Sequence, residues 1–453
     1  MIISEYEQLE RIIQPEKICN IRLFKPITGF SLNSRSINPN QAFFAVRGKH
    51  CDGHDFIQMA VDKGAVFIIA EKYVKTIPKV SFFIVEDTYK SLEKVSAYIR
   101  KKNKCIVYGI TGSIGKTTTK EILSFLLEPY FKVLKNFKTE NNIFGVAKTI
   151  FSLTDEKILI LELGTNAKGE IEQLGKMSSP DIGIITFIKP VHLEGLKDLK
   201  GVFKEKVSFI GVNPKMKVIL NRGDVYLRKI KSSSNIYWFG KDKKNYLSFV
   251  RASTNDNGSV FMIQGKYELI LTKHLDIFIV NFLAAISGAH ILGIPLKCLV
   301  ERANLFKEFP DMRMNMIESN GLYILNDAYN ANPFALREAL RSLKSYPFKK
   351  IAVIGDMLEL GNKSIYYHES VANEVIKNNF EYCLTYGDYC VYLTDKLKKI
   401  GFKKTKHFNS HKEIVKFIKD IINFKSCRRE KYLIFLKGSR NMELEKVVQG
   451  LID

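Results

Sequence analysis

The sequence predicts an α/β protein built from three domains. Its 453 residues are more than a single hydrophobic core usually holds. From residue 104 onwards, strand-like apolar runs alternate with helix-like runs, and this alternation restarts after the segment FKEFPDMRM at 306–314. We therefore expect a small α/β domain at 1–103, a central parallel-sheet domain at 104–306 and a C-terminal Rossmann-like domain at 307–453.

Strands are expected where apolar residues run together between turn-forming residues. In the first domain these runs are AFFAV (42–46), KGAVFIIAEK (63–72) and VSFFIVED (80–87). In the central domain they are KILILELG (157–164), DIGIITFI (181–188) and MKVILN (216–221). In the C-terminal domain they are LYILNDAYNANP (322–333), KKIAVIGDM (349–357), FEYCLTYGD (380–388) and YLIFLKGSR (432–440). Continuous apolar runs are typical of parallel strands that helices cover on both faces.

Two helices can be placed from their own signals. Asn332 and Pro333 form a helix start, and the apolar residues that follow recur on one helical face (Leu336, Ala339, Leu340 and Leu343). The run IFIVNFLAAISGAHILGIPL at 277–296 is nearly long enough to cross a membrane. Polar residues interrupt it (Asn281, Ser287 and His290), so we expect a buried helix and no membrane insertion.

The stretch ITGSIGKTTTKE at 110–121 has the context of a phosphate-binding loop. The apolar run CIVY at 105–108 precedes it, and a helix-like run follows. Backbone N–H groups of such a turn and of the helix N-terminus converge on anionic oxygens. The common pattern G-x-x-x-x-G-K-[ST] has a glycine where this chain has Ile110. We expect Lys116 to reach the β- and γ-phosphates of ATP and Thr117 to bind Mg²⁺.

Polar residues at strand ends mark the places where ligands gather in parallel sheets. Glu162 ends one strand beside the expected phosphate loop, where Mg²⁺ needs a carboxylate ligand. His192 follows another strand, and Asp327 and Lys437 end the first and last strands of the C-terminal domain. The residues alone leave open whether Glu162 binds a metal or caps a helix. They also leave open whether His192 is a ligand or a structural histidine.

Composition favours some classes of protein over others. Lys and Arg number 70 against 47 Asp and Glu, a net charge of +23. The lysines are scattered, and no stretch interleaves basic and aromatic residues as a nucleic-acid-binding segment would. We therefore favour a solvated surface that attracts a polyanionic substrate. The 7 cysteines form no CxxC pair, and the N-terminus lacks the apolar core of a signal peptide. We expect a cytoplasmic protein with reduced thiols.

Several motifs, in order along the chain, resemble those of the Mur ligase family, whose members use ATP to add amino acids to UDP-linked cell-wall peptides. They are TGSIGKTTT (111–119), TENNIFG (139–145), LELGTNAKGEIEQL (161–174), PVHLEGL (190–196), LNRGD (220–224) and VNFLAA (280–285). Others are similar to motifs of the members that add D-alanyl-D-alanine: NDAYNANP (326–333), GDMLELG (355–361), followed by His368, and KGSRNMELE (437–445). Residues 33–65 are similar to the family's uridine-nucleotide domain.

The resemblance implies a set of site residues. Those for ATP are Thr111, Gly112, Ser113, Gly115, Lys116, Thr117, Thr118, Asn281, Arg313 and Asp327. The implied Mg²⁺ ligands are Thr117, Glu162 and His192, and the implied catalytic residues are Lys116, His192 and Lys206. Lys206 stands where the family carries a lysine that CO₂ modifies to a carbamate. Ser34 and Arg35 would bind the UDP substrate, and the residues beside the incoming amino acid would be Asn330, Asn332 and Arg440.

The activity implied is that of an ADP-forming ligase that uses ATP and Mg²⁺. We predict a monomer, without a nucleic-acid partner, that joins D-alanyl-D-alanine or another amino acid to a UDP-linked peptide through an acyl phosphate. Asn33, Asn40 and Ile277 depart from the bacterial motifs and leave the UDP substrate open. An archaeal pseudomurein peptide ligase is an alternative, because glutamine is sparse while lysine and isoleucine are abundant, as in some heat-adapted proteins. A non-catalytic ATP-binding protein and a nucleic-acid-binding P-loop protein are alternatives from other classes.

Overall fold

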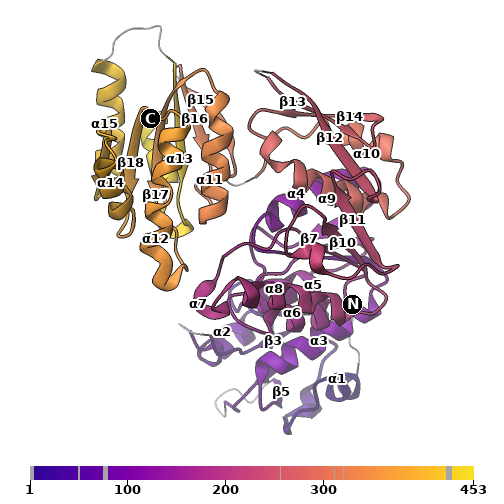
Figure 1. The fold of residues 1–453 in the computed structure, drawn as a ribbon. Helices are drawn as coiled ribbons and strands as arrows, with labels where there is room; N and C mark the ends of the chain where they lie inside the picture. The colour runs from indigo at the N-terminus through magenta and orange to yellow at the C-terminus, as the bar shows by residue number, and fades with distance from the viewer. Residues whose placement is uncertain are drawn as a thin grey trace.

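Three β-sheets, each with its own helices, make up the structure. The computed structural model describes residues 5–48, 51–74, 80–255, 257–310, 312–319, 321–424 and 431–453. In Figure 1 the N-terminal sheet lies below the central sheet, and the C-terminal sheet stands beside the central one. We call the three parts the N-terminal, central and C-terminal regions after these sheets. The predicted three-part α/β class is confirmed, and the predicted domain limits stay a prediction.

The N-terminal region has a five-stranded sheet in the order β1-β5-β4-β3-β2. Strands β2 to β5 pair in parallel, and β1 runs antiparallel to β5. The predicted apolar runs of this region form β3, β4 and β5. Its strands are β1 (Lys17–Cys19), β2 (Gly29–Ser31), β3 (Gln41–Phe44), β4 (Phe67–Ala70) and β5 (Ser81–Ile84), and its helices are α1 (Tyr6–Ile13), α2 (Ile57–Asp62) and α3 (Thr88–Lys102).

The central region has a nine-stranded sheet in the order β14-β13-β12-β11-β10-β9-β6-β8-β7. Its strands are β6 (Ile106–Thr111), β7 (Val133–Lys135), β8 (Ile158–Glu162), β9 (Ile182–Ile185), β10 (Lys217–Asn221), β11 (Ile236–Gly240), β12 (Leu247–Asn255), β13 (Gly258–Ile263) and β14 (Tyr267–Thr272). Its helices are α4 (Lys116–Leu127), α5 (Ile143–Phe151), α6 (Glu170–Ser178), α7 (Leu193–Leu196), α8 (Leu199–Ser208), α9 (Ile279–His290) and α10 (Leu296–Ala303).

Strands β6 to β12 pair in parallel as predicted, but β13 and β14 add an antiparallel extension that the sequence analysis missed. The reason lies in β12, which is buried only at its start and exposed from Val250 to Asn255. A strand that leaves the core has no continuous apolar run to reveal it.

Helices cover both faces of the parallel part of this sheet. The side chains of β8 are buried along the whole strand, and neighbouring residues belong to opposite cores. Ile158 and Ile160 pack with α4 and α9, whereas Leu159 and Leu161 pack with α5, α6 and α8. The apolar run at 277–296 contains α9, which is buried as expected. Within the described ranges, no helix has the length and apolarity that a membrane crossing requires.

The C-terminal region has a six-stranded sheet in the order β15-β16-β20-β17-β18-β19, parallel except for β15. Helix α11 begins as predicted, because the side chain of Asn332 accepts a hydrogen bond from the N–H of Ala335. The strands are β15 (Asn315–Ser319), β16 (Leu322–Asn326), β17 (Lys349–Gly355), β18 (Tyr382–Tyr386), β19 (Thr405–Phe408) and β20 (Tyr432–Lys437). The helices are α11 (Pro333–Ser342), α12 (Ser364–Glu369), α13 (Ala372–Lys377), α14 (Cys390–Lys399), α15 (His411–Phe424) and α16 (Glu445–Ile452).

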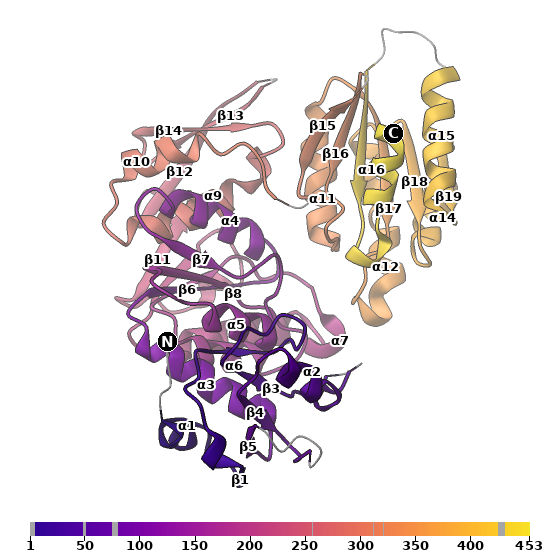
Figure 2. The same cartoon turned by 180° about the vertical axis from the view of Figure 1, so that it is seen from behind.

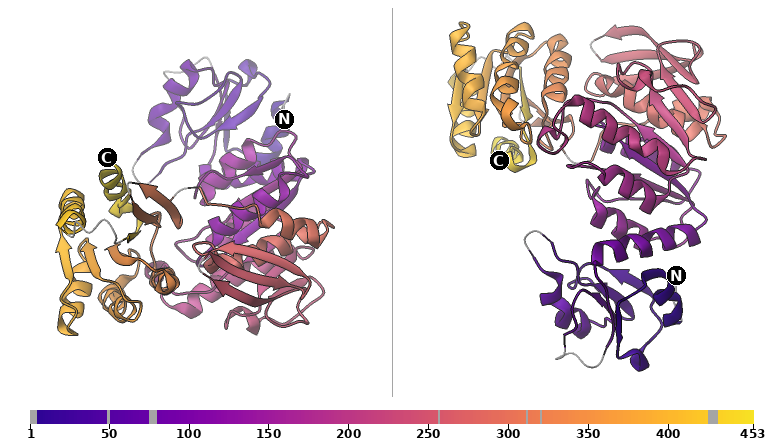
Figure 3. Two further views of the ribbon diagram at one scale, coloured as in Figure 1. Left: turned by 90° about the horizontal axis from the view of Figure 1, so that it is seen from above. Right: turned by 60° about the horizontal axis from the view of Figure 1, so that its bottom comes forward.

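The N-terminal and C-terminal regions lie on different sides of the central region (Figures 2 and 3). Helix α3 of the N-terminal region packs against α5 and α6 of the central region. The C-terminal region lies against another side of the central region. Residues following β6, β8 and β9 of the central sheet therefore line one cavity with residues following β16, β17 and β20 of the C-terminal sheet. The carboxyl ends of two parallel sheets thus meet across this cavity, which is where such sheets bind ligands.

Candidate active site

A cavity of 1410 Å³ lies between the central and C-terminal regions. It exceeds the usual volume of a pocket for one small ligand, about 300–1,000 Å³. Two predicted ATP residues, Thr111 and Gly112, lie behind its wall, and the Thr111 hydroxyl donates to the carbonyl of Leu163 at 3.0 Å. Most of the other predicted residues line it: Ser113, Gly115, Lys116, Thr117, Thr118, Glu162, His192, Asn281, Arg313, Asp327, Asn330, Asn332 and Arg440.

The loop between β6 and α4 depends on two glycines. Gly112 has a φ of 138° and Gly115 a φ of 80°, both in the region that side chains disfavour. A Cβ on Gly112 would lie 2.1 Å from Oγ1 of Thr186, and one on Gly115 would lie 2.3 Å from Nδ2 of Asn281. The loop conformation therefore strongly favours glycine at both positions. The N–H of Ser113 donates to the carbonyl of Phe187 at 2.7 Å, and the N–H groups at the start of α4 remain for an anion, so the residues present fit a phosphate group.

Lys116 opens helix α4 at the mouth of this loop. The first residues of a helix have N–H groups without partners inside the helix, which adds positive potential at the same place. The ammonium group of Lys116 donates to the carbonyl of Gly112 at 3.0 Å. Burial lowers the pKa of Lys116 below its usual value, and the carboxylate of Glu162 partly opposes this shift. Phosphate oxygens would offer Lys116 the anionic partner that its burial calls for.

Thr117 and Glu162 form a buried oxygen pair beside the loop. The hydroxyl of Thr117 donates to Oε2 of Glu162 at 2.6 Å, and Nδ2 of Asn141 donates to Oε1 at 2.8 Å. Glu162 is only 1% exposed. A hydroxyl and a carboxylate are the hard oxygen ligands that Mg²⁺ takes in proteins, with phosphates and water completing its shell. These residues therefore fit a magnesium ion held next to the phosphate loop.

The segment that follows β7 supports Glu162 and was not predicted as part of the site. Asn136 accepts from the backbone N–H of Glu162 at 2.9 Å and donates to its carbonyl at 3.1 Å. The fully buried Lys120 on α4 donates to the carbonyl of Asn136 at 2.9 Å and to that of Lys138. The motif TENNIFG contains Asn141, which contacts Glu162 directly. That motif was the one sequence signal for this support.

His192 precedes α7 and lies at the boundary of the central and C-terminal regions. Its φ of 52° is left-handed, which is uncommon for a histidine. Its Nδ1 atom lies 2.6 Å from Oε2 of Glu359, a residue of the loop after β17. Glu359 also lines the cavity. Glu359 belongs to the motif GDMLELG, but no pattern in the sequence indicates a role for it.

Lys206 lies on α8 and is fully buried. Its Nζ atom has no hydrogen-bond partner within the part of the chain that the structure describes. Burial, and then the charge of Lys116, place the pKa of Lys206 well below its usual value. Buried ammonium groups without partners are unfavourable, so burial favours the neutral amine of this lysine over its ammonium form.

The C-terminal wall of the cavity is polar. Lys437 donates to the carboxylate of Asp327 and, at 3.0 Å, to the carbonyl of Asn330. Burial raises the pKa of Asp327 above its usual value, and Lys437 opposes the shift. The guanidinium of Arg313 lies 4.4 Å from the centre of the Tyr329 ring. Asn332, at the start of α11, lies on the same wall.

Asn281 on α9 joins the helix to the phosphate loop. Its Nδ2 donates to the carbonyl of Gly115 and to the hydroxyl of Thr119, both at 3.0 Å. Since the carbonyl of Gly115 can only accept, the orientation of the amide is fixed. Asn281 also lines the cavity.

The predicted UDP-binding residues belong to the N-terminal region and do not line this cavity. The hydroxyl of Ser34 donates to Sδ of Met59 at 3.4 Å, and the carbonyl of Arg35 accepts from Lys63 at 2.8 Å. Their part in substrate binding stays a prediction.

Comparison with known proteins gives matches along nearly the whole chain. The family descriptions that match are "Mur ligase family, catalytic domain" at residues 26–128, "Mur ligase middle domain" at 110–289 and "Mur ligase, glutamate ligase domain" at 312–440. The UDP-N-acetylmuramoyl-tripeptide–D-alanyl-D-alanine ligase of Buchnera aphidicola is 32% identical over 433 residues, covering 93% of this chain and 92% of that protein. The chain belongs to the Mur ligase family. The protein of the same name from Bacillus subtilis is 29% identical to this Mur ligase and covers 94% of it, with 93% of its own length matched.

Solved Mur ligase structures share the fold. MurF from Acinetobacter baumannii matches with a TM-score of 0.87 and 24% identity over 98% of each chain. The MurF ligase from Thermotoga maritima in complex with ADP matches with a TM-score of 0.80 and 26% identity, covering 94% of this chain and 97% of that one. A pseudomurein peptide ligase type C from Methanothermus fervidus reaches a TM-score of 0.63 and 18% identity, covering 91% and 94%. This Mur ligase is thus more similar to the two MurF proteins than to the pseudomurein ligase.

Proposed function

We propose that this Mur ligase joins D-alanyl-D-alanine to UDP-N-acetylmuramoyl-tripeptide while ATP is converted to ADP and phosphate. The observation that carries the proposal is the cavity in which the phosphate loop and the Thr117–Glu162 pair face the polar C-terminal wall. A ligase of this kind needs a nucleotide, an acceptor peptide and an amine in one space. The relative from Buchnera aphidicola, whose name states this reaction, matches 93% of the chain.

The reaction forms an amide in two steps. The terminal carboxylate of the UDP-linked peptide attacks the γ-phosphorus of ATP, which gives an acyl phosphate and ADP. The amine of the dipeptide then attacks the acyl carbon, and phosphate leaves as the amide forms. Lys116 and the first N–H groups of α4 bind the phosphate oxygens and stabilise the charge that spreads during transfer. Thr117 and Glu162 would hold Mg²⁺, with His192 as a further ligand for the metal, and the ion would supply positive charge beside the transferring phosphoryl group.

Lys206 is the residue we propose for modification by CO₂. A neutral amine attacks the carbon of CO₂, loses a proton and becomes a carbamate, so that a cation is replaced by an anion. The buried, unpartnered Nζ and its lowered pKa support this chemistry. The protein supplied with ¹³C-labelled bicarbonate should show a carbamate carbon signal that is lost in Lys206→Ala and kept in Lys204→Ala, whose lysine is exposed. Short carboxylates should partly restore the activity of Lys206→Ala.

We further propose roles for the residues around ATP and the amine. Arg313 would bind the nucleotide phosphates, because its guanidinium is stacked on Tyr329 and its Nε has no partner among the described residues. Asn281 would contact adenine and Asp327 the ribose. The amine side would be formed by Asn330, Asn332 and Arg440, and the UDP side by Ser34 and Arg35.

The test is ATP-dependent phosphate release by the purified protein. It should occur with UDP-N-acetylmuramoyl-tripeptide and D-alanyl-D-alanine together, and not when either is left out. Lys116→Ala should abolish release while binding of the UDP substrate persists. Release only with UDP-linked glutamyl peptides and single L-amino acids would overturn the proposal in favour of pseudomurein synthesis. ATP and UDP-linked peptides are nucleotides of the cytoplasm, and we propose that the enzyme acts there as a monomer.

A further inference from the structure

The loop Gly355–Gly361 of the C-terminal region contacts the central region beside the cavity. Oε2 of Glu359 lies 2.6 Å from Nδ1 of His192, and a Cβ on Gly361 would lie 3.4 Å from Cγ of Glu194. Figures 1 and 2 both show α7, which follows His192, next to the lower end of α12. The two regions therefore touch at a residue that the proposed mechanism assigns to the metal.

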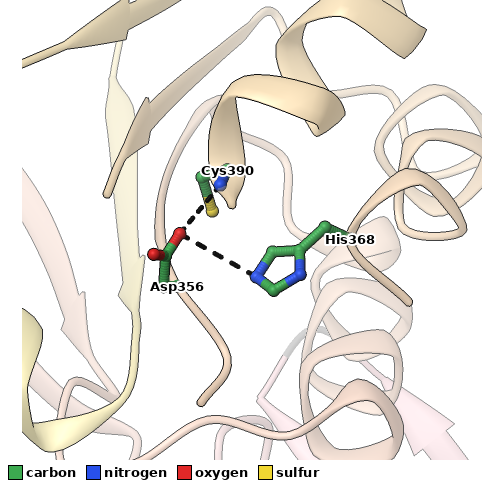
Figure 4. A group of neighbouring side chains, drawn as sticks. All are labelled: Asp356, His368 and Cys390. Atoms are coloured by element: carbon green, nitrogen blue, oxygen red, sulfur yellow. Dashed lines mark hydrogen bonds and ion pairs between the residues drawn. The ribbon is translucent and has the colours of Figure 1, made fainter. Parts of the chain in front are cut away.

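Asp356 of this loop lies beside His368 and Cys390, which come from α12 and α14 (Figure 4). Their polar atoms lie within 4.8 Å of one another, as in a metal site. However, both ring nitrogens of His368 are engaged: Nε2 accepts from the N–H of Met357 at 2.9 Å, and Nδ1 donates to the carbonyl of Ser364 at 2.7 Å. Asp356 accepts from the N–H of Cys390 at 2.8 Å, and burial raises the pKa of the Cys390 thiol. The cluster is a hydrogen-bond network that holds the loop backbone.

The loop also has a fixed connection to the strand beside it. The N–H of Leu358 donates to the hydroxyl of Ser439, which follows β20, at 2.9 Å. The next residue, Glu359, has a φ of 62°, and His192 opposite has a φ of 52°. Left-handed backbone costs roughly 1–2 kcal/mol at a residue other than glycine. Such conformations persist where surrounding contacts impose them, and they cluster at functional sites.

We propose that Glu359 is a positioning residue for His192 and that it orients this metal ligand only while the C-terminal region is seated on the central region. The proposal rests on the proposed function, which makes His192 a metal ligand. The carboxylate lies 2.6 Å from Nδ1 without the angle of a hydrogen bond, and a rotation of the ring would let it accept the Nδ1 hydrogen while Nε2 keeps its lone pair. Metal-binding histidines commonly give their second N–H to a carboxylate in this way. The unusual feature is that the carboxylate comes from a different region of the chain.

The experiment must separate this role of Glu359 from direct binding of the incoming amine. Its side chain is 55% exposed and faces the cavity, so it could instead bind the ammonium group of the incoming dipeptide. A residue that acts through His192 changes metal affinity and loses its effect when His192 is absent. A residue that binds the amine changes the KM for the dipeptide and keeps its effect without His192.

The experiment measures the Mn²⁺ dissociation constant of the full chain by electron paramagnetic resonance, with a non-hydrolysable ATP analogue at saturation. Glu359→Ala should weaken Mn²⁺ binding by about 10–100-fold, the usual effect of removing such a partner. Glu359→Gln keeps an acceptor oxygen and should therefore lose less Mn²⁺ affinity than Glu359→Ala. Glu413→Ala, which removes an exposed carboxylate on α15, should bind Mn²⁺ like the unmodified chain. In a His192→Ala background, Glu359→Ala should cause no further loss.

Coupling between two sites is reciprocal, which gives a second measurement. Mn²⁺ with the ATP analogue should protect the Gly355–Gly361 loop from hydrogen exchange, and Glu359→Ala should remove that protection. Unchanged Mn²⁺ affinity in Glu359→Ala, or an equal loss in the His192→Ala background, would overturn the inference. A higher KM for the dipeptide with unchanged Mn²⁺ affinity would assign Glu359 to the amine instead. If the unmodified chain bound neither Mn²⁺ nor the analogue, the proposed function itself would fail.

Discussion

Replacing Gly115 by Ala should weaken nucleotide binding through Asn281 as well as through the backbone. The φ of 80° at Gly115 costs a residue with a Cβ about 1–2 kcal/mol. The added Cβ would lie 2.3 Å from Nδ2 of Asn281, which must move and give up its hydrogen bonds to Gly115 and Thr119. Two such bonds contribute about 1 kcal/mol each. The variant should therefore lose roughly 3–4 kcal/mol of stability around the phosphate loop.

Only the part that involves Asn281 should appear in nucleotide affinity, since the bound loop needs this side chain in place. A loss of about 2 kcal/mol corresponds to roughly 30-fold weaker binding of ADP with Mg²⁺, measured by calorimetric titration. Gly293→Ala is the matched control, because its φ is 88° and nothing lies within 4 Å of its Cβ position. It should lose stability from strain alone and bind ADP normally. Wild-type affinity in Gly115→Ala, or an undiminished effect in an Asn281→Ala background, would refute the reasoning.

Three further outcomes follow from buried charges. Lys437→Met should lower the free energy of unfolding by about 3–5 kcal/mol, because it leaves Asp327 buried without its partner. The loss should appear as faster hydrogen exchange in β16 and β20. Adding Asp327→Asn should restore most of the lost stability. Arg341 holds the pKa of Glu374 below its usual 4.5 by hydrogen bonding, so this pair stabilises the fold above that pH and the contribution disappears as Glu374 is protonated. In urea titrations the unmodified chain should therefore lose more stability on acidification than Arg341→Met does. Lys120→Met should lower the free energy of unfolding by about 1.5–3 kcal/mol and also weaken Mg²⁺ binding, measured by calorimetry. Unchanged Mg²⁺ affinity in this variant would show that the contacts of Lys120 with backbone carbonyls do not support the site.

Sequence reasoning found the parts of the fold that have a local signature. The strands β8, β9 and β17 are continuous apolar runs, and Asn332 and Pro333 indicate the start of α11. The phosphate loop was visible because its glycines and Lys116 are adjacent in the chain. Residues that act together within one short segment could be predicted.

Features that depend on packing between distant segments could not be predicted in this way. The contact of Glu359 with His192 joins residues from two regions, and no pattern near either one indicates it. The support of Glu162 by Asn136 and Lys120 is equally distant in sequence. The antiparallel extension was missed because β12 becomes polar as it leaves the core. In each case the decisive interaction forms only after the sheets have assembled.

If Asn281 contacts adenine as we propose, its fixed amide limits which purine the cavity accepts. Both of its hydrogens are used to hold Gly115 and Thr119, so its oxygen faces a ligand as an acceptor only. A base that turns an exocyclic amino group towards it gains a hydrogen bond. A base that turns a carbonyl towards it places two acceptors together and loses its contact with water. Base recognition and the shape of the loop therefore depend on the same side chain.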